Sequence, residues 1–281
     1  MQKRTLLKQG SLGPLAPLGM VATGLAPQAL AAERAVSKTE IVLGSIQDLS
    51  DPLASLGKPI RDGLTLRVEQ ANAAGGVHGR QLRLRVEDSG CDPKKAVLAA
   101  DKLVSRDKVF AVVGTLGTAP ARASMPPIID SGVLHLFPIT AHHGCFEPFH
   151  KLKFAAFTPY PDSMRAGLTE MLKKGYKRIA LLYQDDEYGV DIQRATEAAL
   201  KAANLPVVER ASYKRGATDF SSQMQRLRAA NPDLIGLATV VRETIGAVSE
   251  ARKRGTQPLP RQPRQQQAAE PVAGRLQSPL Q

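Results

Sequence analysis

Short apolar runs alternate along this chain with segments whose apolar residues recur at helical spacing. Ile41–Ile46 and Val109–Val113 are continuous runs rich in β-branched residues, and Leu82–Val86 alternates apolar and charged positions with period two. The pattern predicts strands over 41–46, 82–86, 109–113, 133–137, 178–183, 206–210 and 233–239. Between them it predicts helices that begin at Pro52 and Pro93, and helices over 119–130, 162–174, 189–203, 219–230 and 242–254.

Two helix starts carry capping signals. Asp51 and Asp92 each precede a proline, so we expect each aspartate to be an N-cap and each proline to be the first helical residue. Glycines in the stretch 75–79 should end the first helix. The helix over 119–130 is expected even though it contains three prolines.

Continuous apolar strands joined by helices predict parallel sheets covered on both faces. The pattern restarts near Phe154–Tyr160, which indicates two doubly wound α/β lobes, 38–155 and 156–255. Open parallel sheets bind ligands at the carboxyl ends of their strands. We therefore expect a site among the loops that follow the strands, namely 47–57, 114–119, 138–145, 184–189 and 239–243.

The two ends of the chain differ from its middle. Lys3, Arg4 and Lys8 precede an uncharged stretch, and the small residues of 29–31 fit a cleavage site, so 1–31 is predicted to be a secretory signal peptide. Prolines interrupt the apolar stretch, which leaves a disordered tail as the alternative. Residues 256–281 are rich in Gln and Pro and are expected to be disordered.

Composition excludes several classes. Lys and Arg number 38 against 26 Asp and Glu, a net charge of +12, but the basic residues are scattered, so no nucleic-acid partner is expected. No apolar run is long enough for a membrane span after signal removal. We find no nucleophile, base or cofactor loop at the strand ends, so neither an enzyme nor a cofactor is expected.

Several residues invite a chemical interpretation. Cys91 and Cys145 could form a disulfide in an oxidising compartment, although a free Cys91 is favoured. The carboxylates of 185–187 are interpreted as a solvated loop rather than a metal or amine site. His142 and His143 are adjacent, and only Cys145 and Glu147 lie near them at ligand spacing, so no zinc site is expected. Residues 114–117 lack the third glycine of a dinucleotide loop.

Four stretches carry a family resemblance over residues 39–255. They are Ile41–Gly57, Ala71–Gly79 with Glu87–Lys95, Val112–Thr118, and Tyr183–Gly189 with Tyr213–Ser221. In order and spacing they resemble the substrate-binding proteins of bacterial ABC importers for branched-chain amino acids. The resemblance implies the type I periplasmic-binding-protein fold, in which a hinge joins two lobes around a cleft. It also implies a non-enzymatic periplasmic receptor that delivers a branched-chain amino acid, or a related carboxylate or amide, to ABC permease subunits.

The resemblance also implies which residues contact the ligand. Thr118 falls at the hydroxyl that holds the ligand carboxylate, and Ala119 falls where many members have a second hydroxyl. Thr140 falls near another polar contact, and Tyr188 falls on an aromatic residue that closes over the ligand. Leu56 replaces a frequent aromatic ring. Thr118 as a simple N-cap and Tyr188 as a half-buried turn residue remain open alternatives.

The chain departs from the family in two ways. Cys91 matches a family cysteine that in some members bridges to the loop after the third strand, and the facing position here lies near Gly117, so that bridge cannot form. Family members also continue beyond the point where the Gln- and Pro-rich segment begins, so the second lobe is expected to be incomplete. A non-functional truncated product, or a ligand-sensing module of the same fold, are therefore alternative functions.

Overall fold

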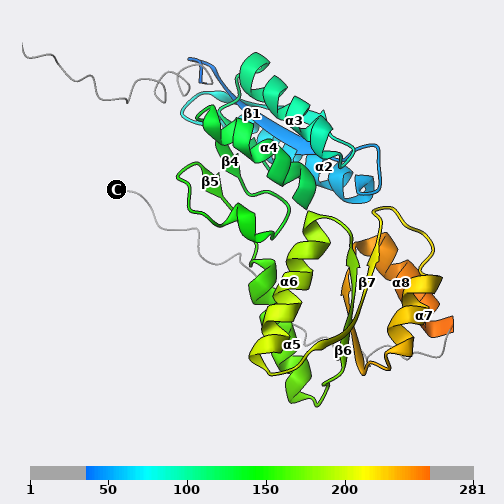
Figure 1. Cartoon of the computed structure of the whole chain (residues 1–281). Coiled ribbons are helices and arrows are strands. Elements are labelled where there is room, and N and C mark those ends of the chain that lie inside the picture. Colours follow the sequence, from blue (N-terminus) through cyan, green and yellow to red (C-terminus); the bar gives the residue numbers. More distant parts are fainter. Residues whose placement is uncertain (1–35, 254–281) are drawn as a thin grey trace, which may run out of the picture.

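The computed structural model describes residues 36–253, which form two parallel sheets in two α/β lobes (Figure 1). The predicted signal peptide and the predicted disordered tail lie outside these residues. The strands of the first sheet, in the order β2-β1-β3-β4-β5, are β1 (Glu40–Gln47), β2 (Gln81–Asp88), β3 (Ala111–Val113), β4 (Leu134–Leu136) and β5 (Lys153–Phe154). Those of the second, in the order β7-β6-β8, are β6 (Ile179–Gln184), β7 (Val207–Tyr213) and β8 (Leu234–Ala238). The predicted fold class of doubly wound parallel sheets is confirmed.

Helices connect most of the successive strands, because parallel strands need crossover connections. The first lobe contains α2 (Ala54–Ala73), α3 (Pro93–Asp101) and α4 (Thr118–Asp130), with a π-helical turn at Lys102–Arg106 and a 3-10 turn at His143–Cys145. The second contains α5 (Tyr160–Lys173), α6 (Glu187–Ala202), α7 (Ser221–Ala229) and α8 (Val241–Lys253). None of these described helices is long and apolar enough to cross a membrane.

One predicted helix start is confirmed and the other is wrong. The carboxylate of Asp92 caps α3, because it accepts hydrogen bonds from the backbone N–H groups of Lys94 (2.7 Å) and Lys95 (2.9 Å). The first helix begins at Ala54 instead of Pro52. The reason lies upstream: the buried carboxylate of Asp48 accepts from the N–H groups of Asp51 and Leu53, both at 2.8 Å, and shapes this segment into a loop.

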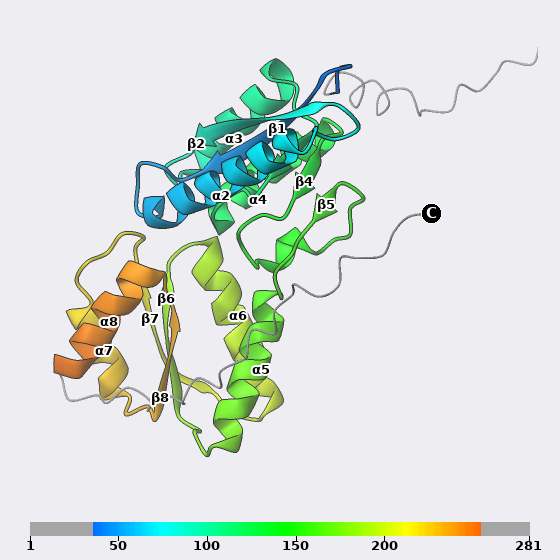
Figure 2. The ribbon, with the colours of Figure 1, turned by 180° about the vertical axis from the view of Figure 1, so that it is seen from behind.

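The two lobes bury apolar residues differently. In the first lobe, the buried cluster lies between the sheet and α3 and α4, and includes Ile46, Leu103 and Ile128. On the opposite face, Gly57 is the one fully buried residue of α2, which crosses that face in Figure 2. In the second lobe, both faces of the sheet carry buried clusters: one includes Phe220 of the β7–α7 segment, and the other includes Leu168 of α5. The prediction that both faces are covered therefore holds most fully for the second lobe.

Candidate functional site

A cavity of about 520 Å³ lies between the two lobes. Its walls come from the segments that follow β1, β2, β3, β4, β6, β7 and β8, so it is located at the carboxyl ends of both sheets, as the sequence predicts. Four of the predicted site residues line it: Leu56, Thr118, Ala119 and Tyr188. Thr140 lies behind this wall, where its hydroxyl is 2.7 Å from that of Thr118.

On the first-lobe wall, the N-terminus of α4 lies at the cavity. Gly117 is the N-cap, with a φ of 92° that favours glycine, and no side chain caps the helix. Thr118 is the first helical residue and its hydroxyl pairs with Thr140, so the interpretation of Thr118 as an N-cap is wrong. The first backbone N–H groups of a helix lack intrahelical acceptors. This wall can therefore hold an anion such as a carboxylate.

Cys91 sits directly opposite Gly117. A Cβ atom at position 117 would lie 3.2 Å from the Cys91 sulfur, which confirms that these two positions face each other. Cys91 and Cys145 are both buried and free, so the alternative disulfide between them is not formed. Burial raises the pKa of each thiol to about 11. Both side chains are therefore neutral thiols near neutral pH.

On the second-lobe wall, Tyr188 lies between a backbone contact and an aromatic ring. Its hydroxyl donates to the carbonyl oxygen of Thr239 at 3.3 Å, and its ring meets that of Tyr160 edge to face, with centroids 5.5 Å apart. Burial raises the pKa of Tyr188 well above its usual value, so the hydroxyl stays protonated. Tyr160, at the start of α5, also lines the cavity, although no sequence pattern distinguished it.

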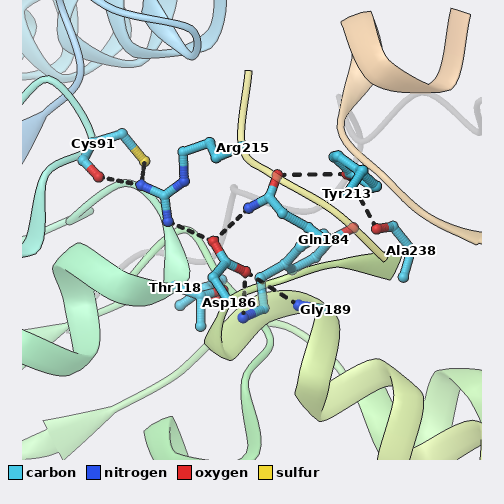
Figure 3. A network of polar contacts seen from close by, with 10 residues as sticks. Cys91, Thr118, Gln184, Asp186, Gly189, Tyr213, Arg215 and Ala238 are labelled. Atoms are coloured by element: carbon cyan, nitrogen blue, oxygen red, sulfur yellow. Dashed lines mark hydrogen bonds and ion pairs between the residues drawn. The ribbon is translucent and has the colours of Figure 1, made fainter. Parts of the chain in front are cut away.

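A network around Asp186 connects the second lobe to the first (Figure 3). Asp186 caps α6 by accepting from the N–H groups of Tyr188 (3.0 Å) and Gly189 (3.3 Å). Its other oxygen accepts from Arg215 at 2.5 Å, and the same guanidinium donates to the backbone carbonyl of Cys91. Arg215 therefore spans the cavity edge between the two lobes. The stretch Tyr213–Ser221 pointed to this loop, but spacing alone gave no reason to select Arg215.

The acidic cluster of 185–187 divides into two kinds of residue. Asp185 and Glu187 are exposed, and Asp185 pairs with the exposed Lys214, as expected for a solvated loop. Asp186 between them is half-buried and has the structural role described above. The interpretation of the cluster as a solvated loop is thus wrong for Asp186, because an N-cap position turns that one side chain toward the helix terminus.

Glu243 brings a buried carboxylate to the cavity wall. It lies in the first turn of α8, is 3% exposed, and pairs with the neighbouring Arg242 at 3.3 Å. Glu243 ends the predicted site loop 239–243, but the helical pattern of 242–254 gave no reason to single it out. The cavity thus combines a helix N-terminus on one wall with a carboxylate on the other.

Comparison with known proteins agrees with this architecture. The family described as periplasmic binding protein matches residues 40–268. The chain is 28% identical over 244 residues to the Leu/Ile/Val-binding protein homolog 7 of Brucella suis, covering 83% of this chain and 61% of that protein. The chain therefore spans about three fifths of the length of this relative.

Solved structures give the same result. A fatty acid ABC transporter substrate-binding protein from Thermomonospora curvata is 26% identical with a TM-score of 0.72, covering 79% of this chain and 56% of that one. A substrate-binding periplasmic protein from Ralstonia solanacearum is 25% identical with a TM-score of 0.71, covering 78% of this chain and 62% of that one. Over the aligned part, this chain therefore shares the fold of these proteins.

Proposed function

This chain belongs to the periplasmic binding protein family, and from that premise we propose that it binds a small carboxylate ligand between its lobes and delivers it to an ABC permease. Proteins of this family are binding proteins rather than enzymes. The observation that carries the proposal is the cavity of about 520 Å³, whose walls come from both lobes and whose first-lobe wall ends in an uncapped helix terminus.

The predicted contacts take distinct roles in this proposal. The N–H groups at the start of α4 and the Thr118 hydroxyl hold the ligand carboxylate, with Ala119 lining the same turn. Thr140 orients the Thr118 hydroxyl from behind, at 2.7 Å. Leu56, which is 38% exposed, packs on the apolar part of the ligand, and Tyr188 covers it from the second lobe.

The charges on the two walls favour an amino acid as the ligand. A helix N-terminus attracts the α-carboxylate, and the carboxylate of Glu243 on the opposite wall can accept from an ammonium group. Apolar side chains at the same cavity, including Leu53, Leu116 and Ile245, suit an aliphatic ligand side chain. The name of the Brucella suis relative agrees with a branched-chain amino acid, whereas that of the Thermomonospora curvata protein suggests a longer carboxylate.

Closure of the lobes is the change by which a permease can recognise a loaded receptor. A ligand that contacts both walls stabilises the closed arrangement, and a permease that docks both lobes then distinguishes loaded from empty receptor. We propose that residues 1–31 direct export and that the receptor acts in the periplasm. We propose further that the lobes divide at residue 155, so that 38–155 and 156–255 move as two bodies.

The test is thermal unfolding of the 281-residue chain against the twenty amino acids and a series of aliphatic and aromatic carboxylates. A ligand that binds only the folded state raises the Tm as its concentration increases. At one hundred times its Kd it adds about 2.7 kcal/mol to the free energy of unfolding. A shift with leucine, isoleucine or valine supports the amino-acid proposal. A shift with fatty acids alone corrects the ligand class, and a cooperative transition that no compound shifts overturns the receptor function.

A further inference from the structure

Two histidines and an aspartate meet where the lobes touch, outside the residues that line the ligand cavity. His142 and His143 belong to the segment between β4 and β5, and Asp191 belongs to α6 of the other lobe. One nitrogen from each histidine and one oxygen from the aspartate all lie within 4.8 Å of one another. The carboxylate comes from a residue 48 positions further along the chain than His143, which is why local spacing excluded a metal site.

The contacts within this cluster are close. The backbone N–H of His143 donates to one oxygen of Asp191 at 3.0 Å, and the His143 ring nitrogen Nδ1 lies 2.5 Å from the other oxygen. The rings of His142 and His143 stack, with centroids 4.5 Å apart and planes inclined by 29°. Both rings and the carboxylate are thus already gathered at one point of the joint between the lobes.

Burial of the Asp191 carboxylate favours a positive charge beside it. The Asp191 side chain is 3% exposed, and its carboxylate accepts from the backbone and the ring of His143. A carboxylate removed from water needs compensating positive charge or hydrogen bonds. The charges of Arg122 and Arg194 act on His142 and oppose a cation there, so binding is expected to be weaker than at an all-cysteine structural zinc site.

We propose that His142, His143 and Asp191 bind a borderline transition-metal ion, Zn²⁺ or Ni²⁺, across the two lobes. Two imidazoles and one carboxylate are a donor set that suits these ions, whereas Ca²⁺ and Mg²⁺ need more oxygen ligands. The His143 side chain is 48% exposed, so the fourth position of the ion opens toward solvent.

Binding requires a small movement that the site permits. Donors on one tetrahedral zinc ion lie about 2.0–2.2 Å from it, so any two of them are separated by about 3.3–3.6 Å. The present donors fall within 4.8 Å, and the ion replaces the hydrogen bond between His143 and Asp191. Rotation of the half-exposed His143 ring supplies the adjustment.

A metal at this point restrains lobe movement. Asp191 lies one helical turn beyond Tyr188 on α6, and His142 follows Thr140 in the loop after β4, so the ion joins the backbones of the two cavity walls. We therefore expect the ion to stabilise the described arrangement of the lobes. This effect depends on the joint alone and holds whatever ligand the cavity takes.

The experiment is calorimetric titration of ZnCl₂ and NiCl₂ into the untagged 281-residue chain, without any cavity ligand. We expect one ion per chain, and binding weakened at least about tenfold in His143→Ala and in Asp191→Asn, which retains the shape of the side chain. His78→Asn is the matched control: His78 is exposed, has a positive φ that asparagine tolerates, and lies far from the cluster in sequence, so its variant should bind like the parent. MgCl₂ should give no binding.

Two further readouts make the result decisive. Circular dichroism establishes that each variant is folded before it is titrated, and CoCl₂ should produce the visible absorption of a low-symmetry site in the parent and in His78→Asn but not in His143→Ala. Equal zinc affinity in the parent, His143→Ala and Asp191→Asn overturns the proposal. So does loss of binding in His78→Asn to the same extent as in His143→Ala, because the ion would then lie elsewhere.

Discussion

In each lobe an aspartate side chain binds backbone N–H groups in the turn after the first strand, which is β1 in the first lobe and β6 in the second. The two turns differ in their contacts with the rest of the molecule. After β1, the carboxylate of Asp48 accepts from the N–H groups of Asp51 and Leu53, and all of these residues lie in the first lobe. After β6, Asp186 accepts from two N–H groups of α6 and also pairs with Arg215, which reaches Cys91 across the cavity. Both lobes thus use a carboxylate to hold the turn between strand and helix, but of these two turns only the one in the second lobe also contacts the other lobe.

The same comparison extends to packing and charge. A glycine in each lobe, Gly57 in α2 and Gly189 in α6, allows its helix to approach the end of the preceding strand. All 5 histidines lie in the first lobe, and none occurs between 156 and 253. The two lobes should therefore respond alike to a mutation at the shared turn and differently to acid.

The largest expected effect tests the shared turn. A Cβ atom on Gly57 would lie 1.9 Å from the carbonyl oxygen of Asp48, and one on Gly189 would lie 1.9 Å from that of Gln184. Gly57→Ala and Gly189→Ala should each lower the free energy of unfolding by at least about 3 kcal/mol, because the helix must move off the strand end. Urea denaturation measures the change.

Two glycines in open positions serve as controls for these variants. Gly63 of α2 and Gly167 of α5 have no atom within 4 Å of an added Cβ. Gly63→Ala and Gly167→Ala should be neutral or stabilise by up to about 1 kcal/mol through helix propensity. If Gly57→Ala and Gly189→Ala matched these controls, close approach would not be what requires glycine at the two turns.

Acid should destabilise the first lobe, which holds the histidines, more than the second. Burial lowers the pKa of His135 to about 4 from the ordinary 6.5, and neither of its ring nitrogens has a hydrogen-bond partner among the described residues. The unfolded chain binds this proton more readily, so stability falls as the pH drops from about 6.5 to about 4. The expected loss is about 3 kcal/mol.

The measurement is the free energy of unfolding by urea at intervals from pH 7 to pH 4. His135→Leu should flatten this part of the profile, since leucine fills a similar volume and cannot titrate. A profile as steep in His135→Leu as in the parent would assign the acid sensitivity to other groups. Burial likewise lowers the pKa of His142 to about 4, so some slope should remain.

A smaller effect on stability is expected from the contacts of Arg215, which connect the two lobes. The side chains of Arg215 and Asp186 are 29% and 18% exposed, so Arg215→Met should cost about 1–2 kcal/mol, between the values for surface and buried pairs. Lys214→Met is the control, because Lys214 pairs with Asp185 in an exposed position and its loss should be almost silent. Thermal unfolding detects the difference, and equal Tm values for the two variants would contradict it.

The smallest effect concerns ligand affinity and compares the two cavity walls. With L-leucine as the probe, Thr118→Val should weaken binding about tenfold, because it removes a hydrogen bond to a charged group. Tyr188→Phe should change the Kd by less than about threefold, because the Tyr188 hydroxyl is already engaged with Thr239 and the ring remains. Isothermal titration measures both. The control variant Thr169→Val, on the outer helix α5, should bind L-leucine like the parent. If Tyr188→Phe lost more affinity than Thr118→Val, the ligand carboxylate would not be held by Thr118 as proposed.

The sequence by itself determined the alternation of strands and helices, the class of fold and the loops that meet at the cavity. These follow from local physics: periodicity selects strand or helix, and parallel strands place their carboxyl ends at one edge. The cap at Asp92 and the position of Gly117 opposite Cys91 were both predicted and confirmed. The start of α2 was missed because the Asp48 side chain binds the backbone of Asp51 and Leu53 and forms a loop before the helix. Hydrophobic periodicity does not register such a local contact between a side chain and the backbone.

Only the tertiary structure decided which side chains meet between the lobes. Arg215 reaches Cys91, Glu243 lines the cavity, and His143 contacts Asp191, although these pairs lie far apart along the chain. Such contacts depend on how two independently formed sheets are placed against each other, and no local spacing records that placement. The sequence thus fixes each lobe through short-range patterns, while the chemistry between the lobes arises from long-range packing.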